Sequence, residues 1–508
     1  MSLDVKKSLS RPPEIMGLEM GKGISSKAPS LTLRVAEATE LDELVRRGAH
    51  VFVADSLSDP SIAQIEKGEF KKFATEFGAV ATLMNSTSET VFLLVDTVAA
   101  NSGGAVASSI LKGIQFFLNA DTSGSSLELY VSPGIHNKYP RFCSALAGEV
   151  DSRLGEGFPY SELLVNLVAM PNGAGGEGLN YEAGYVNVCY RALKSAKRIS
   201  NLPPNLSTPR NMVEWTYSLF EEIGDKVTIK KIRADEGDFE FSRRLIDSEN
   251  NAAEILEITY TPDVRSLSHV SLIGKGVTFD AGGLALKPWK DQELMKYDKI
   301  GAVVCLLATH AAASLGFPVK ITTYVVFCEN LLRENSIKPG SVYRVGESGY
   351  VEVNNPDGEG RLLLADCLNH IAVGPERPDS AITVATLTGD SFDIFGDIYL
   401  PYFTNDDRNE RLVGEAARES GEKVWRMPLD PAFKKYLSSN LSGVIKNYSN
   451  SAARLITSAC FISQFAGEMN WVHFDMAGIS VANGSASGRP LLFLINLLKQ
   501  IGGEAARA

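Results

Sequence analysis

The sequence of 508 residues is poor in cysteine and histidine, with six of each. The cysteines stand far apart, form no CxxC pair and mostly lie in apolar runs, which argues against a disulfide framework or a cysteine-ligated zinc site. The pattern predicts buried free thiols in a reducing compartment. The six cysteines are Cys143, Cys189, Cys305, Cys328, Cys367 and Cys460.

The sequence also lacks a long apolar run. The most apolar helical stretch, residues 302–313, is followed by Gly316 and Pro318. It is therefore shorter than the roughly 20 residues that a membrane-spanning helix needs. No secretory signal pattern is recognisable either. We therefore expect a cytoplasmic protein with no membrane partner.

Residues 1–29 are rich in Ser and Lys and contain few acids, and Pro and Gly interrupt them. This composition favours a flexible N-terminal tail. Organelle-targeting segments share the basic, acid-poor character, so targeting by this tail stays open as the alternative.

A basic excess is absent as well. The chain has 50 Lys and Arg against 61 Asp and Glu, for a formal net charge of -11 at pH 7. Binding to nucleic acid or to an anionic membrane requires a basic surface. We therefore expect no nucleic-acid partner.

What the sequence does contain is an alternation of strand-like and helical segments, in a chain too long for one hydrophobic core. Residues 30–180 predict a smaller N-terminal α/β domain with a largely parallel sheet. Residues 181–204 predict a linking helix and a junction, because NLPPNLSTP cannot continue a helix. Residues 205–508 repeat the α/β pattern in a second domain.

The individual segments follow from hydrophobic period and turn residues. In the first domain, strands are expected at residues 30–37, 50–56, 90–97 and 126–132, and helices at 105–120 and 139–154. In the second, strands are expected at residues 254–260, 269–280, 320–330, 380–389 and 471–478, and helices at 301–316, 360–373, 454–467 and 489–503.

The first stretch with chemical character is LIGKGVTFDAGGLALKPWKDQELMKYDKIGA, residues 272–302. An apolar run contains Gly274-Lys275-Gly276, and Asp280, Lys287 and Asp298 follow. Polar residues at the carboxyl end of a strand, before a glycine loop, mark the usual site of open α/β sheets. A tight turn with a solvated lysine is the alternative for Gly-Lys-Gly. The spacing excludes a phosphate loop.

The second stretch is VEVNNPDGEGRLLLADCL, residues 351–368. Asp357, Glu359 and Arg361 alternate through a glycine-interrupted loop, and an apolar helix starts directly afterwards. Taken alone, the two acids could simply cap that helix, since acids favour the positive end of the helix dipole.

The combination favours metal binding. Packed together, Asp280, Asp298, Asp357 and Glu359 would repel one another, and divalent ions resolve that conflict. Carboxylate oxygens suit Mg and Mn, and zinc also accepts them. No histidine lies in either stretch, so an HExxH protease is excluded.

These stretches resemble the leucyl aminopeptidase (cytosol aminopeptidase) family of dinuclear metallopeptidases. NNPDGEGRLLLAD is similar to the family's NTDAEGRL signature, with Pro356 and Gly358 in place of Thr and Ala. GKGVTFDAGGLALKP is similar to its metal- and lysine-bearing segment. NLPPNLSTP, ATLTG, NDD, WRMPL, WVHFDMAG and SGRP follow the expected order. The resemblance spans about residues 199–502 and implies an α/β/α catalytic domain with a central mixed sheet.

The resemblance implies a metal-dependent aminopeptidase that removes the N-terminal residue, Leu or another apolar one preferred, from short peptides. It assigns Lys275, Asp280, Asp298 and Glu359 to the tighter of two metals. It assigns Asp280, Asp357 and Glu359 to the exchangeable one. The metals would be Zn, Mn or Co, with Mg as a further option.

Two cations take catalytic roles by the same resemblance. Lys287 would polarise the scissile carbonyl, and Arg361 would bind a bicarbonate ion that acts as general base. A guanidinium at the start of a helix is a sound anion site, because its fork of donors adds to the helix dipole.

The resemblance also implies a pocket for the substrate's first side chain. Met295, Thr386, Gly389 and Ala486 would line it, and the Leu387 carbonyl would accept a hydrogen bond from the substrate backbone.

The family further implies a homohexamer with inward-facing active sites, which would restrict access to short peptides. Lys299 and Asp390 depart from the family's usual small or apolar residues and leave the side-chain preference open. Two other functions stay open: a catalytically quiet scaffold or binding protein of the same fold, and a dinuclear phosphoesterase. Phosphoesterase sites usually include histidine ligands.

Overall fold

The computed structural model describes the backbone of seven strands between residues 30 and 169 and the chain from 176 to 505 without 234–238, 246–252, 264–267 and 347–348. Side chains are described within residues 184–504. The chain divides into two units, Met1–Arg191 and Ala192–Ala508.

The N-terminal unit contains one seven-stranded sheet of order β1-β7-β6-β2-β5-β4-β3. The strands from β1 to β5 in this order pair in parallel, and β4 and β3 pair antiparallel at one edge. Their bounds are β1 (Ser30–Glu37), β2 (His50–Ala54), β3 (Phe70–Phe77), β4 (Val80–Asn85), β5 (Val91–Val95), β6 (Gly124–Val131) and β7 (Tyr160–Ala169).

The sequence predicted β1, β2, β5 and β6 and missed the other three. β3, FKKFATEF, is an edge strand whose lysines and glutamate hide its strand character, as is common where a sheet edge meets solvent. The helices predicted at residues 105–120 and 139–154 lie outside the described residues. The linking helix predicted at residues 181–199 is α6 (Gly176–Ser200), which begins five residues earlier.

The C-terminal unit is built on an eight-stranded sheet of order β16-β15-β18-β14-β10-β11-β9-β8. Its inner strands are parallel, whereas β8, β9 and the β15–β18 pair run antiparallel, so the predicted mixed sheet is confirmed. The bounds are β8 (Val227–Ile232), β9 (Glu254–Tyr260), β10 (His269–Asp280), β11 (Lys320–Asn330), β14 (Ser380–Ala385), β15 (Leu400–Thr404), β16 (Val424–Arg426) and β18 (Asn470–Asp475).

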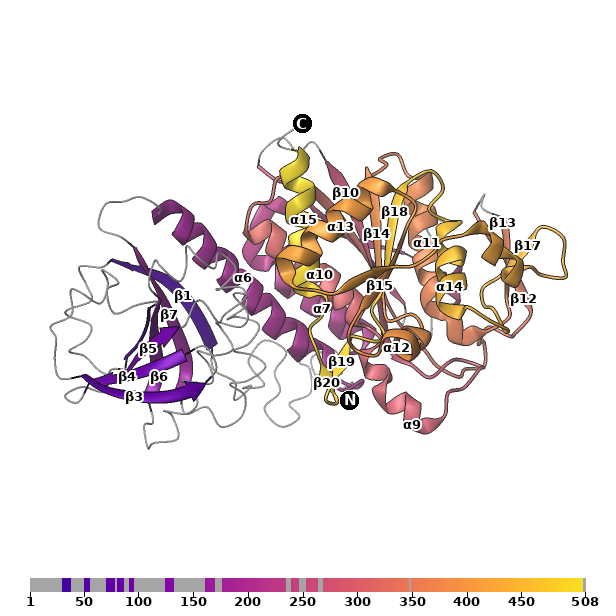
Figure 1. Ribbon diagram of the computed structural model, residues 1–508. Helices are drawn as coiled ribbons and strands as arrows, with labels where there is room; N and C mark the ends of the chain where they lie inside the picture. The colour runs from indigo at the N-terminus through magenta and orange to yellow at the C-terminus, as the bar shows by residue number, and fades with distance from the viewer. Residues whose placement is uncertain are drawn as a thin grey trace, which may run out of the picture. The chain divides into compact units, whose positions relative to one another are not determined.

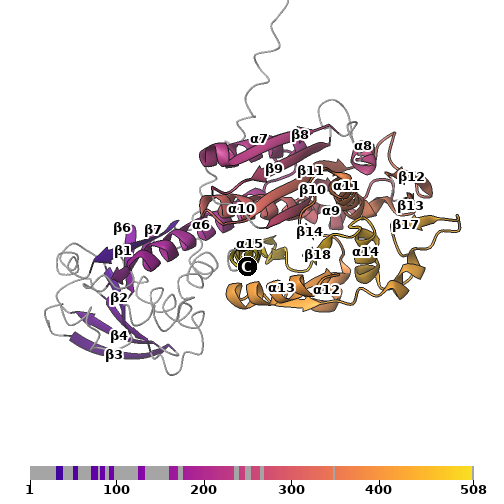
Figure 2. The same cartoon turned by 90° about the horizontal axis from the view of Figure 1, so that it is seen from above.

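Helices cover both faces of this sheet, as Figures 1 and 2 show. On one face lie α7 (Pro209–Phe220), α10 (Ile300–Ser314), α13 (Asp407–Ser420) and α15 (Leu491–Ala505). On the other lie α11 (Glu359–Val373) and α14 (Arg454–Ser463), which share a buried core with β10 and β14. The predicted α/β/α layering of this unit is therefore confirmed.

Smaller elements complete the C-terminal unit. They are α8 (Glu240–Arg244), α9 (Trp289–Gln292), α12 (Asp390–Phe395), the 3-10 turns η3 (Glu221–Lys226), η4 (Glu293–Tyr297), η5 (Pro356–Gly358) and η6 (Pro431–Leu437), the sheet β12 (Ser341–Val345), β13 (Gly349–Val353) and β17 (Val444–Lys446), and the hairpin β19 (Val481–Ala482) and β20 (Ser485–Ala486).

Gly274-Lys275-Gly276 is not a tight turn but the middle of β10. The glycines are there because α10 lies directly on the strand: a Cβ on Gly274 would stand 2.6 Å from Ala302 Cα. On the helix side, a Cβ on Gly301 would stand 2.4 Å from the Val384 carbonyl oxygen. This close approach brings Lys275 and the start of α10 together.

Among the described residues, five cysteines are free and buried, as the sequence predicts, whereas Cys143 lies outside them. No helix in the described ranges is long and apolar enough to cross a membrane.

His473 makes the stability of this unit depend on pH. It is 1% exposed, its ring lies parallel to that of Trp471 and near that of Phe403, and it shares a 3.0 Å hydrogen bond between its Nδ1 and Thr383 Oγ1. Burial lowers its pKa from 6.5 to about 3. Between these values the unfolded chain binds the proton and the folded protein does not, so stability falls as pH decreases.

We predict that the free energy of unfolding drops by on the order of 1.4 kcal/mol per pH unit below about pH 6 through this group. In His473→Phe, which keeps the aromatic stack, that part of the slope should disappear. Urea unfolding followed by tryptophan fluorescence at pH 5, 6 and 7 measures it. Equal slopes in the two proteins would contradict the assignment.

Candidate metal centre

The carboxyl ends of the inner parallel strands meet at one edge of the sheet and bring polar side chains together. Asp280 is the last residue of β10, Asn330 the last of β11, and Thr386 follows β14 directly. The chain turns away from β10 at Gly282 and Gly283, whose φ angles are 89° and 58°. Such angles suit glycine, and they allow Gly282 N to donate to Asp280 Oδ1 at 2.9 Å.

Lys275 lies at the centre of the first group of contacts. Its ammonium is buried, with Nζ 2.7 Å from Asp298 Oδ2 and 2.9 Å from Glu359 Oε1. It also donates to the Thr386 carbonyl oxygen at 3.1 Å. Thr386 Oγ1 in turn donates to Asp298 Oδ1 at 2.7 Å. The loop after β14 therefore holds both the lysine and the aspartate.

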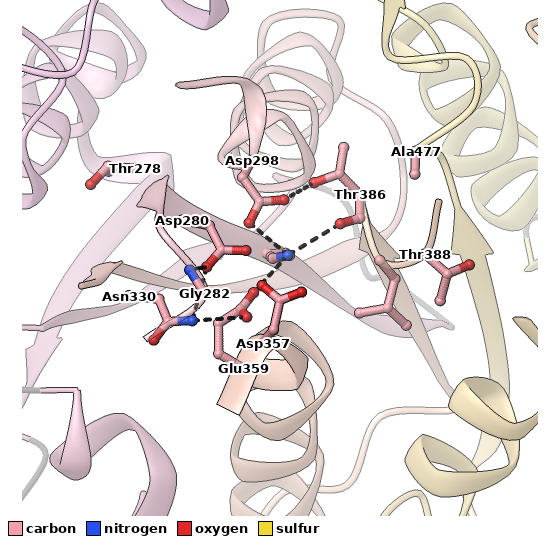
Figure 3. A network of polar contacts seen from close by, with 12 residues as sticks. Thr278, Asp280, Gly282, Asp298, Asn330, Asp357, Glu359, Thr386, Thr388 and Ala477 are labelled. Atoms are coloured by element: carbon pink, nitrogen blue, oxygen red, sulfur yellow. Dashed lines mark hydrogen bonds and ion pairs between the residues drawn. The ribbon is translucent and has the colours of Figure 1, made fainter. Parts of the chain in front are cut away.

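Lys287 organises the second group. It follows the glycine loop, and its Nζ lies 2.7 Å from Asp280 Oδ2 and pairs closely with Asp357 Oδ1. Asp357 belongs to the 3-10 turn η5, which leads into α11 at Glu359. Figure 3 shows Asp280, Asp298, Asp357 and Glu359 directed toward a common centre from three different segments.

Asn330 is a site residue that the sequence analysis missed. It is 3% exposed, and its Nδ2 donates to Asp280 Oδ1 at 2.8 Å, to Glu359 Oε2 at 3.1 Å and to the Pro356 carbonyl oxygen at 3.2 Å. One amide thus fixes the relative position of a carboxylate from β10 and one from α11. Its signal was a polar residue at the end of the strand beside β10, hidden in the apolar run VVFCEN.

Asp475 is a second missed residue. It ends β18, is fully buried, and accepts hydrogen bonds from Leu387 N, Thr388 Oγ1 and Ala477 N at 3.2, 2.7 and 3.2 Å. Burial raises its pKa to about 6 despite these donors. Asp475 therefore fixes the backbone of the loop that carries Thr386.

The pKa values record an excess of negative charge. Burial raises the pKa of Asp298 to about 7, although the Lys275 ammonium opposes it. Burial and the Glu359 carboxylate raise the pKa of Asp357 to about 6 and that of Asp280 above its usual range. Burial alone would lower the pKa of Lys275, but Asp298 and Glu359 hold it above its ordinary value. Added positive charge would relieve this repulsion.

The donor set fits divalent cations. One oxygen each from Asp280, Asp357 and Glu359 lies within 4.8 Å of the others, and Lys275 and Asp298 adjoin this group. Carboxylate oxygens are ligands for Mg, Mn and Zn. Four carboxylates also balance two divalent ions if the Lys275 amine is neutral.

Arg361 does not contact these carboxylates directly. It lies in the first turn of α11, is 2% exposed, and donates from Nη1 to the Asn447 carbonyl oxygen at 3.0 Å. Its guanidinium carbon stands 5.0 Å from the centre of the Tyr448 ring. Burial lowers its pKa. Its buried Nε has no hydrogen-bond partner within the described part of the chain, which leaves one donor for an anion.

The residues expected to line a substrate pocket occupy several segments. Thr386 contacts Lys275 and Asp298, and Leu387 N is bound by Asp475. Gly389 precedes α12, and Met295 lies in η4, where its carbonyl oxygen accepts from Asp298 N at 3.3 Å. Ala486 is buried in β20.

Comparison with known proteins decides the family. The sequence profile of the "Cytosol aminopeptidase family, catalytic domain" matches residues 194–495, more than half of the chain. The chain belongs to the cytosol aminopeptidase family. The resemblance drawn from residues 199–502 is thereby confirmed.

Relatives in this family match about 60% of the chain. A "Probable cytosol aminopeptidase" of Legionella pneumophila (strain Corby) is 35% identical over 311 residues, 60% of this chain and 63% of that protein. One of Nitrosospira multiformis is 33% identical over 310 residues, 60% and 59%. The matched part thus spans less than two thirds of either cytosol aminopeptidase.

Solved structures agree on the fold. The "Bottromycin maturation enzyme BotP in complex with Mn" superposes with a TM-score of 0.73 at 23% identity, over 90% of this chain and 100% of that one. A second structure, described as "Bottromycin maturation enzyme BotP", superposes with a TM-score of 0.72 at 22% identity.

Gly360 tests how closely α11 constrains Lys275. A Cβ at this position would stand 2.7 Å from Lys275 Cε. We predict that Gly360→Ala displaces the lysine and weakens Mn²⁺ binding about ten- to hundredfold, the usual effect of disturbing a residue that orients metal ligands. Isothermal calorimetry on metal-stripped protein measures this.

The control is Gly414→Ala in α13, where a Cβ would meet nothing within 4 Å. Both substitutions add the same helix propensity, about 1 kcal/mol. The control should bind Mn²⁺ as the unmodified protein does. Equal affinities for the two variants would show that Gly360 does not constrain the site.

Proposed function

We propose that this protein is a metal-dependent aminopeptidase that hydrolyses the N-terminal residue, Leu or another apolar one preferred, from short peptides. The observation that carries the proposal is the ion-paired cluster of four carboxylates and two lysines at the carboxyl edge of the sheet, in which Lys275, Asp280, Asp298 and Glu359 are buried. Membership of the cytosol aminopeptidase family supports it.

Two divalent ions are proposed as cofactors, Zn, Mn or Co, with Mg as a further option. Lys275, Asp280, Asp298 and Glu359 would hold the tighter ion, and Asp280, Asp357 and Glu359 the exchangeable one. The BotP relative is described in complex with Mn, which supports manganese. Two divalent ions bound there would lower the pKa of a water molecule and stabilise the oxyanion of the tetrahedral transition state.

Lys287 is proposed to polarise the scissile carbonyl. Its ammonium pairs with Asp280 and Asp357. Burial alone would lower its pKa, but these carboxylates and Glu359 outweigh burial and hold the pKa above the ordinary value. The group therefore remains charged at neutral pH. When those carboxylates are neutralised by divalent cations, the ammonium is available to a developing oxyanion.

Arg361 is proposed to bind bicarbonate as the general base. Its buried Nε is the donor that supports this role, since a desolvated guanidinium with a spare N–H favours a small planar anion. The Asn447 carbonyl oxygen accepts from Nη1, and the guanidinium lies over the Tyr448 ring. The anion would take the proton of the attacking water and pass it to the leaving amine.

Substrate and assembly follow the same proposal. Met295, Thr386, Gly389 and Ala486 would line the pocket for the first side chain, and the Leu387 carbonyl would bind the peptide backbone. A homohexamer with inward-facing sites is proposed from family membership, and it would admit short peptides.

A catalytically quiet scaffold of the same fold is the second candidate. The metal-fitting carboxylates, Lys287 and Arg361 are all retained, which favours catalysis. A dinuclear phosphoesterase is disfavoured because no histidine lies among the residues of the described carboxylate cluster.

Metal-stripped protein tests the proposal. Hydrolysis of a leucine amide should return on adding Mn²⁺, Zn²⁺ or Co²⁺, whereas a phosphate ester should not be hydrolysed. Glu359→Gln removes one negative ligand and should lower the metal-restored rate by about two orders of magnitude or more. The matched control, Glu334→Gln on an exposed loop, should keep it.

Protein that is folded but inactive with every metal would favour the scaffold. Phosphate-ester hydrolysis without amide hydrolysis would favour the phosphoesterase.

A further inference from the structure

Asn201 links two segments that are far apart in the sequence. It follows the last residue of α6, and its Oδ1 accepts from Ala486 N in β20 at 3.1 Å. The same oxygen lies 3.0 Å from the hydroxyl of Tyr297 in η4. One side-chain oxygen therefore joins the β19–β20 hairpin to the 3-10 turn η4.

Tyr297 strengthens this link. It is 4% exposed, and its hydroxyl also lies 2.9 Å from the Gly484 carbonyl oxygen at the tip of the hairpin. A hydroxyl carries a single hydrogen, which it shares between Asn201 and Gly484. Gly484 belongs to the hairpin, and Asn201 is bonded to it through Ala486 N. The hydroxyl therefore fixes the spacing between η4 and the hairpin.

Lys299 anchors the same, C-terminal end of the turn. It is fully buried, and its Nζ donates to the carbonyl oxygens of Lys296, Ser200 and Leu202 at 2.5, 3.3 and 3.4 Å. Burying an ammonium is costly, and the three carbonyl oxygens offset part of that cost. The lysine thereby binds η4 to residues 200–202, on both sides of Asn201.

These contacts converge on two proposed walls of the substrate pocket. Met295 lies in η4, two residues before Tyr297, and Ala486 is the hairpin residue bound by Asn201. Tyr297 and Asn201 stand between the two walls.

We propose that Asn201, Tyr297 and Lys299, the pocket frame, are positioning residues that set the spacing of Met295 and Ala486 and thereby select the substrate's first side chain. The inference rests on the proposed aminopeptidase function. It assigns these residues no role in bond cleavage. A leucine side chain spans the pocket and depends on both walls, whereas an alanine side chain does not.

The frame acts on the pocket separately from the metal ligands. Asp298 follows Tyr297 in sequence, but its carboxylate is held by Lys275 Nζ at 2.7 Å and Thr386 Oγ1 at 2.7 Å. Neither contact involves the Tyr297 hydroxyl. Removing that hydroxyl should therefore change side-chain selection and leave metal affinity unchanged.

Tyr297→Phe tests the frame, because it deletes only the hydroxyl. We expect the ratio of kcat/KM for leucine amide over alanine amide to fall about three- to tenfold, within the range that one or two methylene contacts provide. Mn²⁺ affinity by calorimetry should stay the same. Lys299→Met, which keeps the length of the side chain, should lower the ratio further.

Tyr260→Phe is the matched control. Its buried hydroxyl donates to the Phe317 carbonyl oxygen at 3.1 Å, outside the site. It should lose thermal stability as Tyr297→Phe does, with the Leu-to-Ala ratio intact. Equal ratios in the two variants overturn the frame while the aminopeptidase stands. An unmodified protein that hydrolyses neither amide overturns both proposals.

Discussion

Four carboxyl groups meet at one edge of the central sheet, three of them buried and that of Asp357 partly exposed, and the surrounding contacts depend on their mutual repulsion. Asp298 has its pKa raised to about 7 and Asp357 to about 6, mainly by burial. Lys275 and Lys287 offset this charge through direct ion pairs. Breaking a buried charge cluster on one side costs several kcal/mol, so each partner must be held in place. The site is built to keep cations and carboxylates in contact.

The fold meets that constraint by close backbone packing. Lys275 reaches the cluster from the middle of β10 because Gly274 lets the start of α10 lie on the strand. Gly360 leaves room for the lysine stem beside α11. Asn330 at the end of β11 and Asp475 at the end of β18 fix the loops that carry the carboxylates and Thr386. Parallel strands end at the same edge of the sheet, and this brings the charged side chains at their ends together in one centre.

The sequence predicted this centre well because its residues stand in two short stretches, where carboxylates, lysines and glycines are unusual among apolar runs. Asn330 and Asp475 were missed, since a lone polar residue at a strand end has no periodic signal and acts through residues distant in sequence. Two residues of the pocket frame, Asn201 and Tyr297, were missed for the same reason, because Asn201 meets Ala486 across 285 positions. Gly274-Lys275-Gly276 also admitted a turn, and only the packing of α10 shows why a strand needs those glycines.

The carboxylate cluster and Lys275 are proposed to hold two divalent ions. Anomalous diffraction from crystals soaked in Mn²⁺, collected at the manganese absorption edge, tests this most directly. Two peaks per chain are expected, one bounded by Lys275, Asp298 and Glu359 and one by Asp357 and Glu359, roughly 3.5–4 Å apart as in other two-metal sites. A single peak away from Lys275, or none at this cluster, would contradict the two-ion centre.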